Sequence, residues 1–291
     1  MGGGGAGIRG DSVIGSHGFF GATDHDVRAF LEPTANLALS KDAVHVWRAA
    51  LDVPETQIGV LRETLDEDEL RRAERFRFPE HRRHFIVARG ILRRLLARYL
   101  NEPADRIGFE YNRYGKPFLK EQGSSLIRFN LSHSGGMALY VFSRIREVGI
   151  DIEWTRRRMG DAEQIATRFF SPREAKVLLG IPEHLRKEAF FGCWTRKEAY
   201  IKARGKGLSI PLDRFEVIPL SEETIPPNGS TNASDRDNLS ILTDPFTLRT
   251  NDGPRQTTWG MRTFKVGHEH IAAVVVEGEE WRMQCWQWRG I

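Results

Sequence analysis

The chain has 291 residues, which is long for one compact core and comfortable for two. Its 40% hydrophobic and 28% charged residues are typical of a soluble protein, and no apolar run reaches the roughly 18 residues of a membrane span. The net charge of +4 does not by itself indicate a nucleic-acid partner, and two cysteines are too few for a disulfide framework, so a reducing, cytoplasmic location is expected.

The first part of the chain predicts a leader, strands and two helices. Residues 1–40 are glycine-rich and lack periodicity, so we expect a flexible leader outside the fold. Residues 44–47 alternate as a strand does, and helical patterns follow over residues 61–77 and 82–99. Residues 109–111 predict a short strand.

Local signals mark where several helices begin and end. Asp66 with Glu69, and Ser171 with Glu174, have the spacing of a capping box, in which each side chain bonds the other residue's backbone N–H. Gly205 is typical of the residue just past a helix end. These signals predict helix starts after Asp66 and Ser171 and a stop at Gly205.

The second part of the chain predicts a central β-region, then helices, then a final group of strands. Residues 127–154 have the pattern of a strand, a glycine turn, a second strand and a third. Helices are predicted over residues 161–170, after Ser171 and over residues 185–203. Alternation predicts further strands at residues 215–218, 258–266, 270–277 and 281–288, the last three forming an antiparallel group.

The order of strands, helices and strands occurs twice, with a join near residue 148. We therefore predict an α+β fold of two similar halves, with an N-terminal half over residues 41–148 and a C-terminal half over residues 149–291. No strict sequence repeat accompanies the join, so the division rests on the pattern of elements alone.

Asp151 and Glu153 lie two residues apart on the third central strand, so their side chains should point to the same side. Two carboxylates held together repel each other, and a cation offsets that cost. Mg²⁺ commonly takes one or two carboxylates together with substrate phosphates. Taken alone, this pair fits a solvent-facing edge strand better than a metal site.

Glu198 changes that weighting. It shares a helix face with Trp194 and Lys202, because residues four apart lie on one side of a helix. Glu and Lys at this spacing often form a plain surface pair worth about 0.3–0.5 kcal/mol. The aromatic stripe that precedes them nevertheless predicts a face that packs inward. A third acid and a lysine against the two-acid strand would form a metal and phosphate site.

The segment from Asn130 to His133 precedes the glycine turn and offers ligands for phosphate. We expect Ser132 and His133 in the loop, where backbone amides, small side chains and a histidine receive phosphate oxygens. A hairpin with a capping serine and a surface histidine explains these residues equally well. Lys116, in a Gly-Lys-Pro turn, is by itself an ordinary turn lysine.

Taken together, these segments resemble the 4′-phosphopantetheinyl transferase superfamily, in particular the larger type exemplified by surfactin-synthetase-activating enzymes. The matching segments occur in the family's order and span roughly residues 43–218. They are Tyr114–Pro117, Phe129–Ser134, Val148–Glu153, Arg168–Glu174 and Trp194–Lys202. One such motif would be a weak signal, whereas five in one order are a specific one.

The resemblance implies a pseudo-twofold monomer with the active site in the cleft between the two halves, where coenzyme A binds. It implies Mg²⁺-dependent transfer of the 4′-phosphopantetheine arm of coenzyme A to a serine of an acyl or peptidyl carrier protein, with release of 3′,5′-ADP, as in holo-acyl-carrier-protein synthases. Such carriers serve fatty-acid, polyketide and nonribosomal-peptide synthesis. Neither a nucleic acid nor a membrane is an implied partner.

By the same resemblance, Asp151, Glu153 and Glu198 hold Mg²⁺ on the coenzyme A pyrophosphate. Glu198 is also the implied general base for the carrier serine, and Lys202 lies near the pyrophosphate and stabilises charge on the leaving group. The remaining coenzyme A contacts are assigned to Arg113, Lys116, Asn130, Ser132 and His133.

Two other functions would use these residues differently. A Mg²⁺-dependent phosphodiester hydrolase would employ the same three acids and need no carrier protein. A basic binding module would leave the acids as surface pairs, but the chain lacks the interleaved aromatic and basic residues of single-strand binders.

Overall fold

A computed structural model describes Phe30 and residues 37–120, 126–156, 162–218, 246–250 and 256–290. The predicted leader, residues 1–40, lies mostly outside this described part. Helices and strands occur together throughout it, which confirms the predicted α+β class. No helix in these ranges combines the length and the apolar surface that crossing a bilayer needs.

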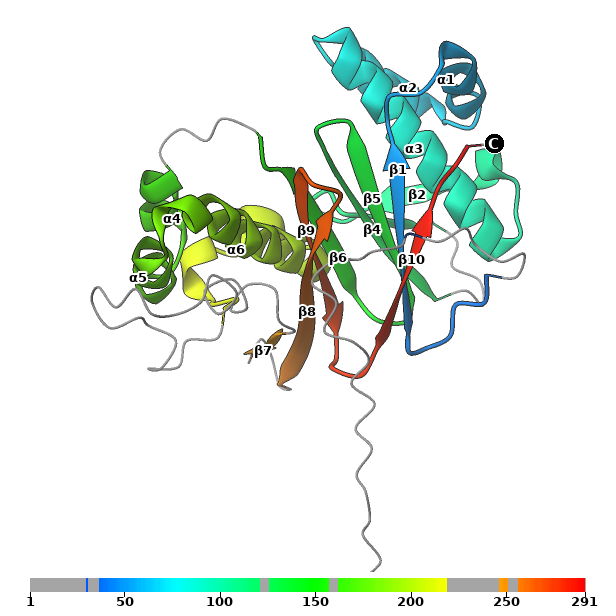
Figure 1. The fold of residues 1–291 in the computed structure, drawn as a ribbon. Coiled ribbons are helices and arrows are strands. Elements are labelled where there is room, and N and C mark those ends of the chain that lie inside the picture. Colours follow the sequence, from blue (N-terminus) through cyan, green and yellow to red (C-terminus); the bar gives the residue numbers. More distant parts are fainter. Residues whose placement is uncertain are drawn as a thin grey trace, which may run out of the picture.

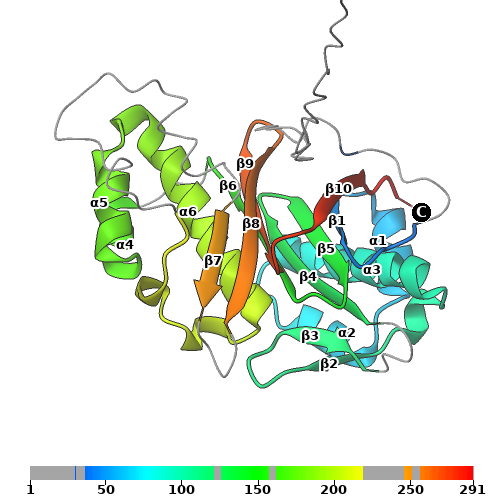
Figure 2. The same cartoon turned by 90° about the horizontal axis from the view of Figure 1, so that it is seen from below.

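The first sheet has the strand order β10-β1-β5-β4. Its strands are β1 (Ala43–Ala50), β4 (Ile127–Ser134), β5 (Met137–Arg144) and β10 (Arg282–Gln287). β10 runs parallel to β1, as the red and blue arrows show in Figure 1, whereas β5 pairs antiparallel with both β1 and β4, and Figure 2 shows β4 beside β5.

The position of β10 corrects the predicted group of three C-terminal antiparallel strands. Only β8 (Thr257–Val266) and β9 (His270–Glu277) form that pair, while β10 joins the first sheet. Its alternation fits that place, because Trp286 packs into the core under the helices of the first sheet and Cys285 packs into the core on the other face. The alternation of side chains thus predicted that residues 281–288 form a strand, but it could not predict that this strand pairs with β1.

Three helices cover one face of the first sheet (Figure 1). They are α1 (Glu55–Arg62), α2 (Glu67–Glu74) and α3 (Pro79–Leu100). The single helix predicted over residues 61–77 is therefore wrong, since the chain ends one helix at Arg62 and starts the next after Asp66. The predicted capping box of Asp66 and Glu69 is confirmed at that start. A short hairpin of β2 (Phe109–Tyr111) and β3 (Pro117–Leu119) follows α3, after the 3₁₀ turn Ala104–Arg106.

The second sheet has the strand order β6-β9-β8-β7 and is antiparallel throughout. Its remaining strands are β6 (Val148–Trp154) and β7 (Phe246–Thr250). The long helix α6 (Glu183–Arg204) lies against this sheet, with α4 (Ala162–Phe169) and α5 (Pro172–Gly180) beyond it (Figure 1). The capping box at the start of α5 and the stop of α6 at Gly205 are confirmed.

Residues 215–218 do not form the predicted strand; they follow two 3₁₀ turns, Gly207–Ser209 and Leu212–Arg214. Val217 and Ile218 are buried in the core around α6. Backbone carbonyls here accept from α6 instead of from a strand, since Arg196 donates to Val217 O at 2.8 Å and Lys197 to Phe215 O at 2.7 Å.

The two sheets share an apolar core but not a hydrogen-bonded ladder. Residues of β1 and β5 meet residues of β6, β8 and β9 in that core, among them Val46, Val141, Ile150 and Val274. β4 and β6 belong to different sheets, yet they lie side by side where the sheets meet. A pseudo-twofold relation between the predicted halves stays a prediction.

Candidate active site

β6 separates its apolar and acidic side chains as predicted. Ile150 and Ile152 are buried in the core that the two sheets share. Asp151 lies between them in sequence and turns its carboxylate to the opposite side, toward β4 and α6. It is 4% exposed, so it is not a solvent-facing acid on an open edge. A carboxylate that is buried to this extent requires partners.

Close packing of α6 on β6 supplies those partners. A methyl group at Gly149 would lie 2.0 Å from the carbonyl oxygen of Ala199, so only glycine allows this approach. Lys202, on the same helix, donates from its ammonium to Asp151 Oδ1 at 2.6 Å and to Ser132 Oγ at 2.9 Å. The acidic strand and the predicted helix face therefore meet.

Glu198 lies one helical turn before Lys202, on the same face. Burial raises the pKa of its carboxyl, and the charge of Asp151 raises it further; Lys202 lowers this pKa and Glu153 raises it. Three carboxylates within electrostatic reach of one another favour a bound cation or a proton on one of them. The charges of Asp151, Glu153 and Lys202 therefore all act on the Glu198 carboxyl.

Side chains of β4 bridge to β6 where no backbone ladder connects the two strands. Asn130 Oδ1 accepts from Ile150 N at 3.1 Å, Ser132 Oγ donates to Asp151 Oδ1 at 2.8 Å, and Ser134 Oγ donates to Glu153 Oε2 at 3.2 Å. We call these three bridges the β4–β6 seam. These bridges fix the acids of β6 relative to the first sheet. Asn130 contributes by accepting the hydrogen bond of the Ile150 N–H through its side-chain oxygen.

Ser132 and His133 do not lie in the loop where the sequence placed them. Both are inside β4, opposite Leu139 and Ala138 of β5, and the turn consists of Gly135 and Gly136 alone. Both glycines have positive φ angles, which explains why the turn is so short. Because neighbours on a strand alternate, Ser132 faces the seam and His133 leaves on the opposite side.

His133 belongs to a cluster of basic side chains. Its side chain is exposed, and its pKa is lowered by partial desolvation and by the charges of His84, Lys202 and His81. His84, on α3, lies 2.8 Å from Asp52 Oδ1 through its Nε2 atom. Sequence reasoning did not single out His81 or His84; the His-Arg-Arg-His pattern at the start of α3 was the available signal. A cluster of this kind suits an anion with several charges.

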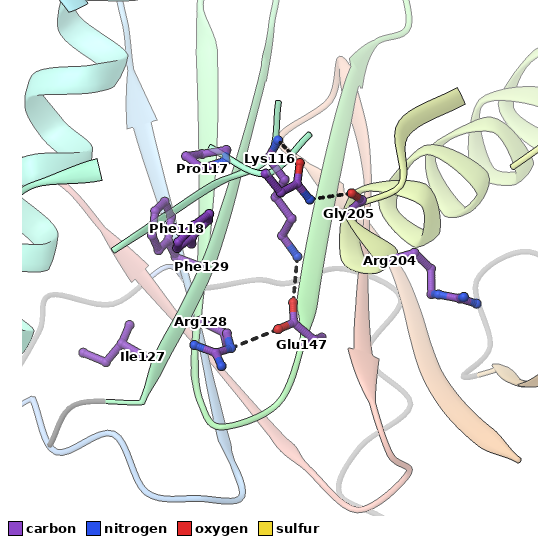
Figure 3. Close-up of a pocket in the computed structure, with 10 residues that line it drawn as sticks. Lys116, Pro117, Phe118, Ile127, Arg128, Phe129, Glu147, Arg204 and Gly205 are labelled. Atoms are coloured by element: carbon purple, nitrogen blue, oxygen red, sulfur yellow. Dashed lines mark hydrogen bonds and ion pairs between the residues drawn. The ribbon is translucent and has the colours of Figure 1, made fainter. Parts of the chain in front are cut away.

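Lys116 and Arg113 lie elsewhere, at the tip of the β2–β3 hairpin. The Lys116 ammonium donates to Glu147 Oε2 at 2.9 Å, as Figure 3 shows, and to Ala203 O at 2.8 Å. The Lys116 ammonium also reaches Val148 O at the start of β6. Asp151 is three residues further along this strand, a separation of about 10 Å. The Arg113 guanidinium stacks on the Tyr114 ring, 4.6 Å from its centroid. The structure therefore does not gather these two side chains with the acids.

The acids fit Mg²⁺. Asp151 Oδ2 is buried and has no hydrogen-bond partner, and an orphaned carboxylate oxygen at such a place is what a cation would satisfy. In the described ranges, no group of three or more His, Cys, Asp or Glu side chains is arranged to hold a metal ion. Mg²⁺ seldom needs such a group, since it commonly takes one or two carboxylates and completes its shell with phosphate oxygens and water. Asp151 and Glu198 offer such a partial set.

Sequence comparisons show which family the chain is similar to. A family model described as "4′-phosphopantetheinyl transferase superfamily" matches residues 147–275, and one described as "4′-phosphopantetheinyl transferase, N-terminal" matches residues 53–143. The 4′-phosphopantetheinyl transferase HetI of Nostoc sp. is 38% identical over 260 residues, which is 89% of this chain and 98% of HetI. This chain belongs to the 4′-phosphopantetheinyl transferase superfamily.

Other relatives within the superfamily are similar over shorter stretches. A putative 4′-phosphopantetheinyl transferase of Synechocystis sp., slr0495, is 33% identical over 191 residues, or 64% of this chain and 76% of that relative. The 4′-phosphopantetheinyl transferase Sfp of Bacillus subtilis is 34% identical over 143 residues, or 49% of this chain and 61% of Sfp. The resemblance that the five motifs indicated is thus confirmed.

Glu174, whose role the sequence left open, lies behind α6 in this superfamily member. Its carboxylate pairs with Lys197 Nζ at 2.7 Å and accepts from Val217 N at 2.8 Å, and both side chains of the ion pair are fully buried. Lys197 immediately precedes Glu198, so this ion pair holds the back of the helix turn that carries the candidate base. Glu174 also completes the capping box with Ser171 that the spacing predicted.

Proposed function

We propose that this protein transfers the 4′-phosphopantetheine arm of coenzyme A to a serine of an acyl or peptidyl carrier protein, with Mg²⁺, releasing 3′,5′-ADP and acting as a cytoplasmic monomer. The observation that carries the proposal is the hydrogen bonding of the two carboxylate oxygens of Asp151. One of its oxygens is bound by Lys202 and Ser132, and the other is buried without a partner beside Glu198. The names of the relatives support the same reaction.

In this proposal Asp151, Glu153 and Glu198 hold the metal ion, which would neutralise the pyrophosphate and orient it when bound. The carrier serine oxygen forms a bond to the β-phosphorus, and the bond from that phosphorus to 3′,5′-ADP breaks. Glu198 takes the serine proton, for which its raised pKa makes it a better base than an ordinary carboxylate. Lys202 stabilises the negative charge left on 3′,5′-ADP.

We assign the nucleotide contacts to Ser132 and His133 and a supporting role to Asn130, and we assign no contact to Arg113 and Lys116, which lie at the hairpin tip away from the acids. Ser132 is in reach of the pyrophosphate, because it already touches Asp151 and Lys202. His133 and its basic neighbours suit the 3′-phosphate. Asn130 has its oxygen engaged on the seam, so its part in binding is to hold the strand that carries Ser132 and His133.

Transfer is tested by incubating the protein with fluorescent coenzyme A and apo carrier proteins from fatty-acid, polyketide and nonribosomal-peptide systems. The proposal expects labelling that needs the carrier serine and is lost when EDTA replaces Mg²⁺. A carrier with Ser→Ala at the acceptor position is the matched control. Release of 3′,5′-ADP without any carrier would instead identify a hydrolase, and the absence of labelling on every carrier would refute the transfer.

His133→Ala is expected to weaken coenzyme A binding about ten-fold, because one charged hydrogen bond to the 3′-phosphate is lost. Binding of 3′-dephospho-coenzyme A should change less than about two-fold. Isothermal titration with both ligands measures the difference. An equal loss for both ligands would place His133 away from the 3′-phosphate.

The preference of the wild type for coenzyme A over 3′-dephospho-coenzyme A should also depend on pH. The lowered pKa of His133 leaves it mostly neutral near neutral pH, and a phosphate beside it favours the protonated form. The preference should therefore rise as the pH falls from about 8 toward 6.5, where the phosphate stays largely dianionic. His81, His84 and Lys202 face the same site, so His133→Ala should reduce this rise rather than remove it.

A further inference from the structure

The tip of the β2–β3 hairpin reaches from the first sheet's side of the molecule to the end of α6. Asn112 organises this tip, since its Oδ1 atom accepts from Tyr114 N at 2.9 Å and from Lys116 N at 3.0 Å. The other end of the same amide, Nδ2, donates to Gly205 O at 2.6 Å. A single side chain thus shapes the turn and binds the residue at which α6 stops.

Lys116 makes the second connection. Its ammonium donates to Ala203 O at 2.8 Å and to Val148 O at 3.3 Å, and it pairs with Glu147, which also pairs with Arg128 at 2.9 Å (Figure 3). The last carbonyls of a helix have no partner within the helix and carry partial negative charge. A cation from the hairpin therefore caps the end of α6 and ties it to the start of β6.

On the hairpin side, the junction with the end of α6 includes an open pocket beside these polar contacts. A pocket of about 300 Å³ opens between the hairpin, the start of β4 and the end of α6, with Phe118, Arg128 and Gly205 among its lining residues. Arg204 points away from the Lys116–Glu147–Arg128 group in Figure 3 and donates to Tyr200 at 2.7 Å. Beside an open pocket, the bonds from Asn112 and Lys116 hold the hairpin side of the helix end.

The tied turn of α6 is the one that carries the catalytic groups. Lys202 immediately precedes Ala203, and Glu198 lies one turn earlier. On its other side, this part of the helix presses on Gly149, where a methyl group would lie 2.4 Å from Ala203 N. The helix end is therefore held between β6 and the hairpin, and a shift there would move the Lys202 ammonium relative to Asp151.

We propose that Asn112 and Lys116 are positioning residues that form a clamp on the last turn of α6 and thereby set Lys202 and Glu198 on Asp151. The inference rests on the proposed transferase function for its catalytic consequence, but the clamp itself is a property of the fold. It gives the Lys116 side chain a role distinct from a direct nucleotide contact.

The test uses the full chain with Asn112→Ala and Lys116→Met, and with Glu110→Ala, an exposed change on β2, as the matched control. Each clamp variant should lower kcat about ten-fold and change KM for coenzyme A less than about two-fold, because positioning is lost while binding groups stay. In a Lys202→Ala background, Lys116→Met should lower kcat by a clearly smaller factor, about three-fold, since one of the two groups that the clamp positions is absent.

Amide hydrogen exchange tests the clamp without relying on enzyme activity. Amides of residues 199–204 should exchange faster in both clamp variants, while amides of residues 184–190 and the control stay unchanged. If the wild type labelled no carrier, the proposed function would be refuted, and the hydrogen-exchange experiment would still test the clamp. Unchanged exchange at residues 199–204, an equal loss of kcat with and without Lys202, or a rise in KM alone would overturn the clamp.

Discussion

Replacing Asp151 with Asn should lower phosphopantetheine transfer about a hundred- to a thousand-fold while the protein stays folded. Asn keeps the size of the side chain and can still accept from Ser132 through its oxygen. It removes the charge that Lys202 binds and turns the buried, unpartnered Oδ2 position into an amide nitrogen, which is a donor and repels a cation. Initial rates of carrier labelling measure the loss.

Mg²⁺-dependent binding of coenzyme A and the melting temperature complete this test. The variant should lose the Mg²⁺-dependent part of the affinity, and it should melt within about 3 °C of the wild type because repulsion among the carboxylates is relieved as the ion pair is lost. Asp42→Asn is the matched control, since it breaks an exposed ion pair with Arg282 at 2.6 Å. Near-normal transfer by the Asp151 variant would remove this residue from the metal site.

Gly149→Ala should damage both stability and activity. The added methyl group would lie 2.0 Å from Ala199 O and 2.4 Å from Ala203 N, which are backbone atoms that cannot rotate away. Overpacking of this kind costs about 1–3 kcal/mol or more. A helix pushed outward by about 1 Å should lower kcat roughly a hundred-fold, since Glu198 and Lys202 move with it. Urea denaturation and labelling rates measure the two effects.

Gly59→Ala is the control for the same chemical change. Gly59 lies inside α1, and a methyl group there would meet nothing within 4 Å. Alanine in an exposed helix interior should stabilise the protein by about 0.5–1 kcal/mol and leave transfer unchanged. If Gly149→Ala also behaved in this way, close packing of α6 on β6 would not be what places the catalytic side chains.

Features that depend on neighbouring residues could be predicted from the sequence. Both capping boxes occur where the spacing placed them, because the bonds of a capping box join residues three apart. The alternation of Ile150, Asp151 and Ile152 similarly predicted which side chains of β6 enter the core. Likewise, the helix face of Glu198 and Lys202 follows from a spacing of four residues.

Features that depend on distant partners could not be predicted in this way. The pattern of residues 281–288 predicts a strand, but only tertiary packing decides that its neighbour is β1. His133 keeps its strand position because Gly135 and Gly136 make the turn alone, so the loop begins later than expected. For Lys116, the turn sequence predicts an exposed lysine, whereas Ala203 O and Glu147 come from parts of the chain remote in sequence.

The pairing of β10 with β1 also bears on how the protein forms during synthesis. Arg48 bonds Gln287 at 2.7 Å across 239 positions of sequence, so β1 waits with one free edge until nearly the whole chain has left the ribosome. Contacts this distant in sequence slow folding, and an unpaired strand edge invites association with other chains. An N-terminal fragment ending near residue 148 should therefore accumulate as aggregates, and a peptide with the β10 sequence should only slow this, because it covers the strand edge but not the apolar face shared with the second sheet.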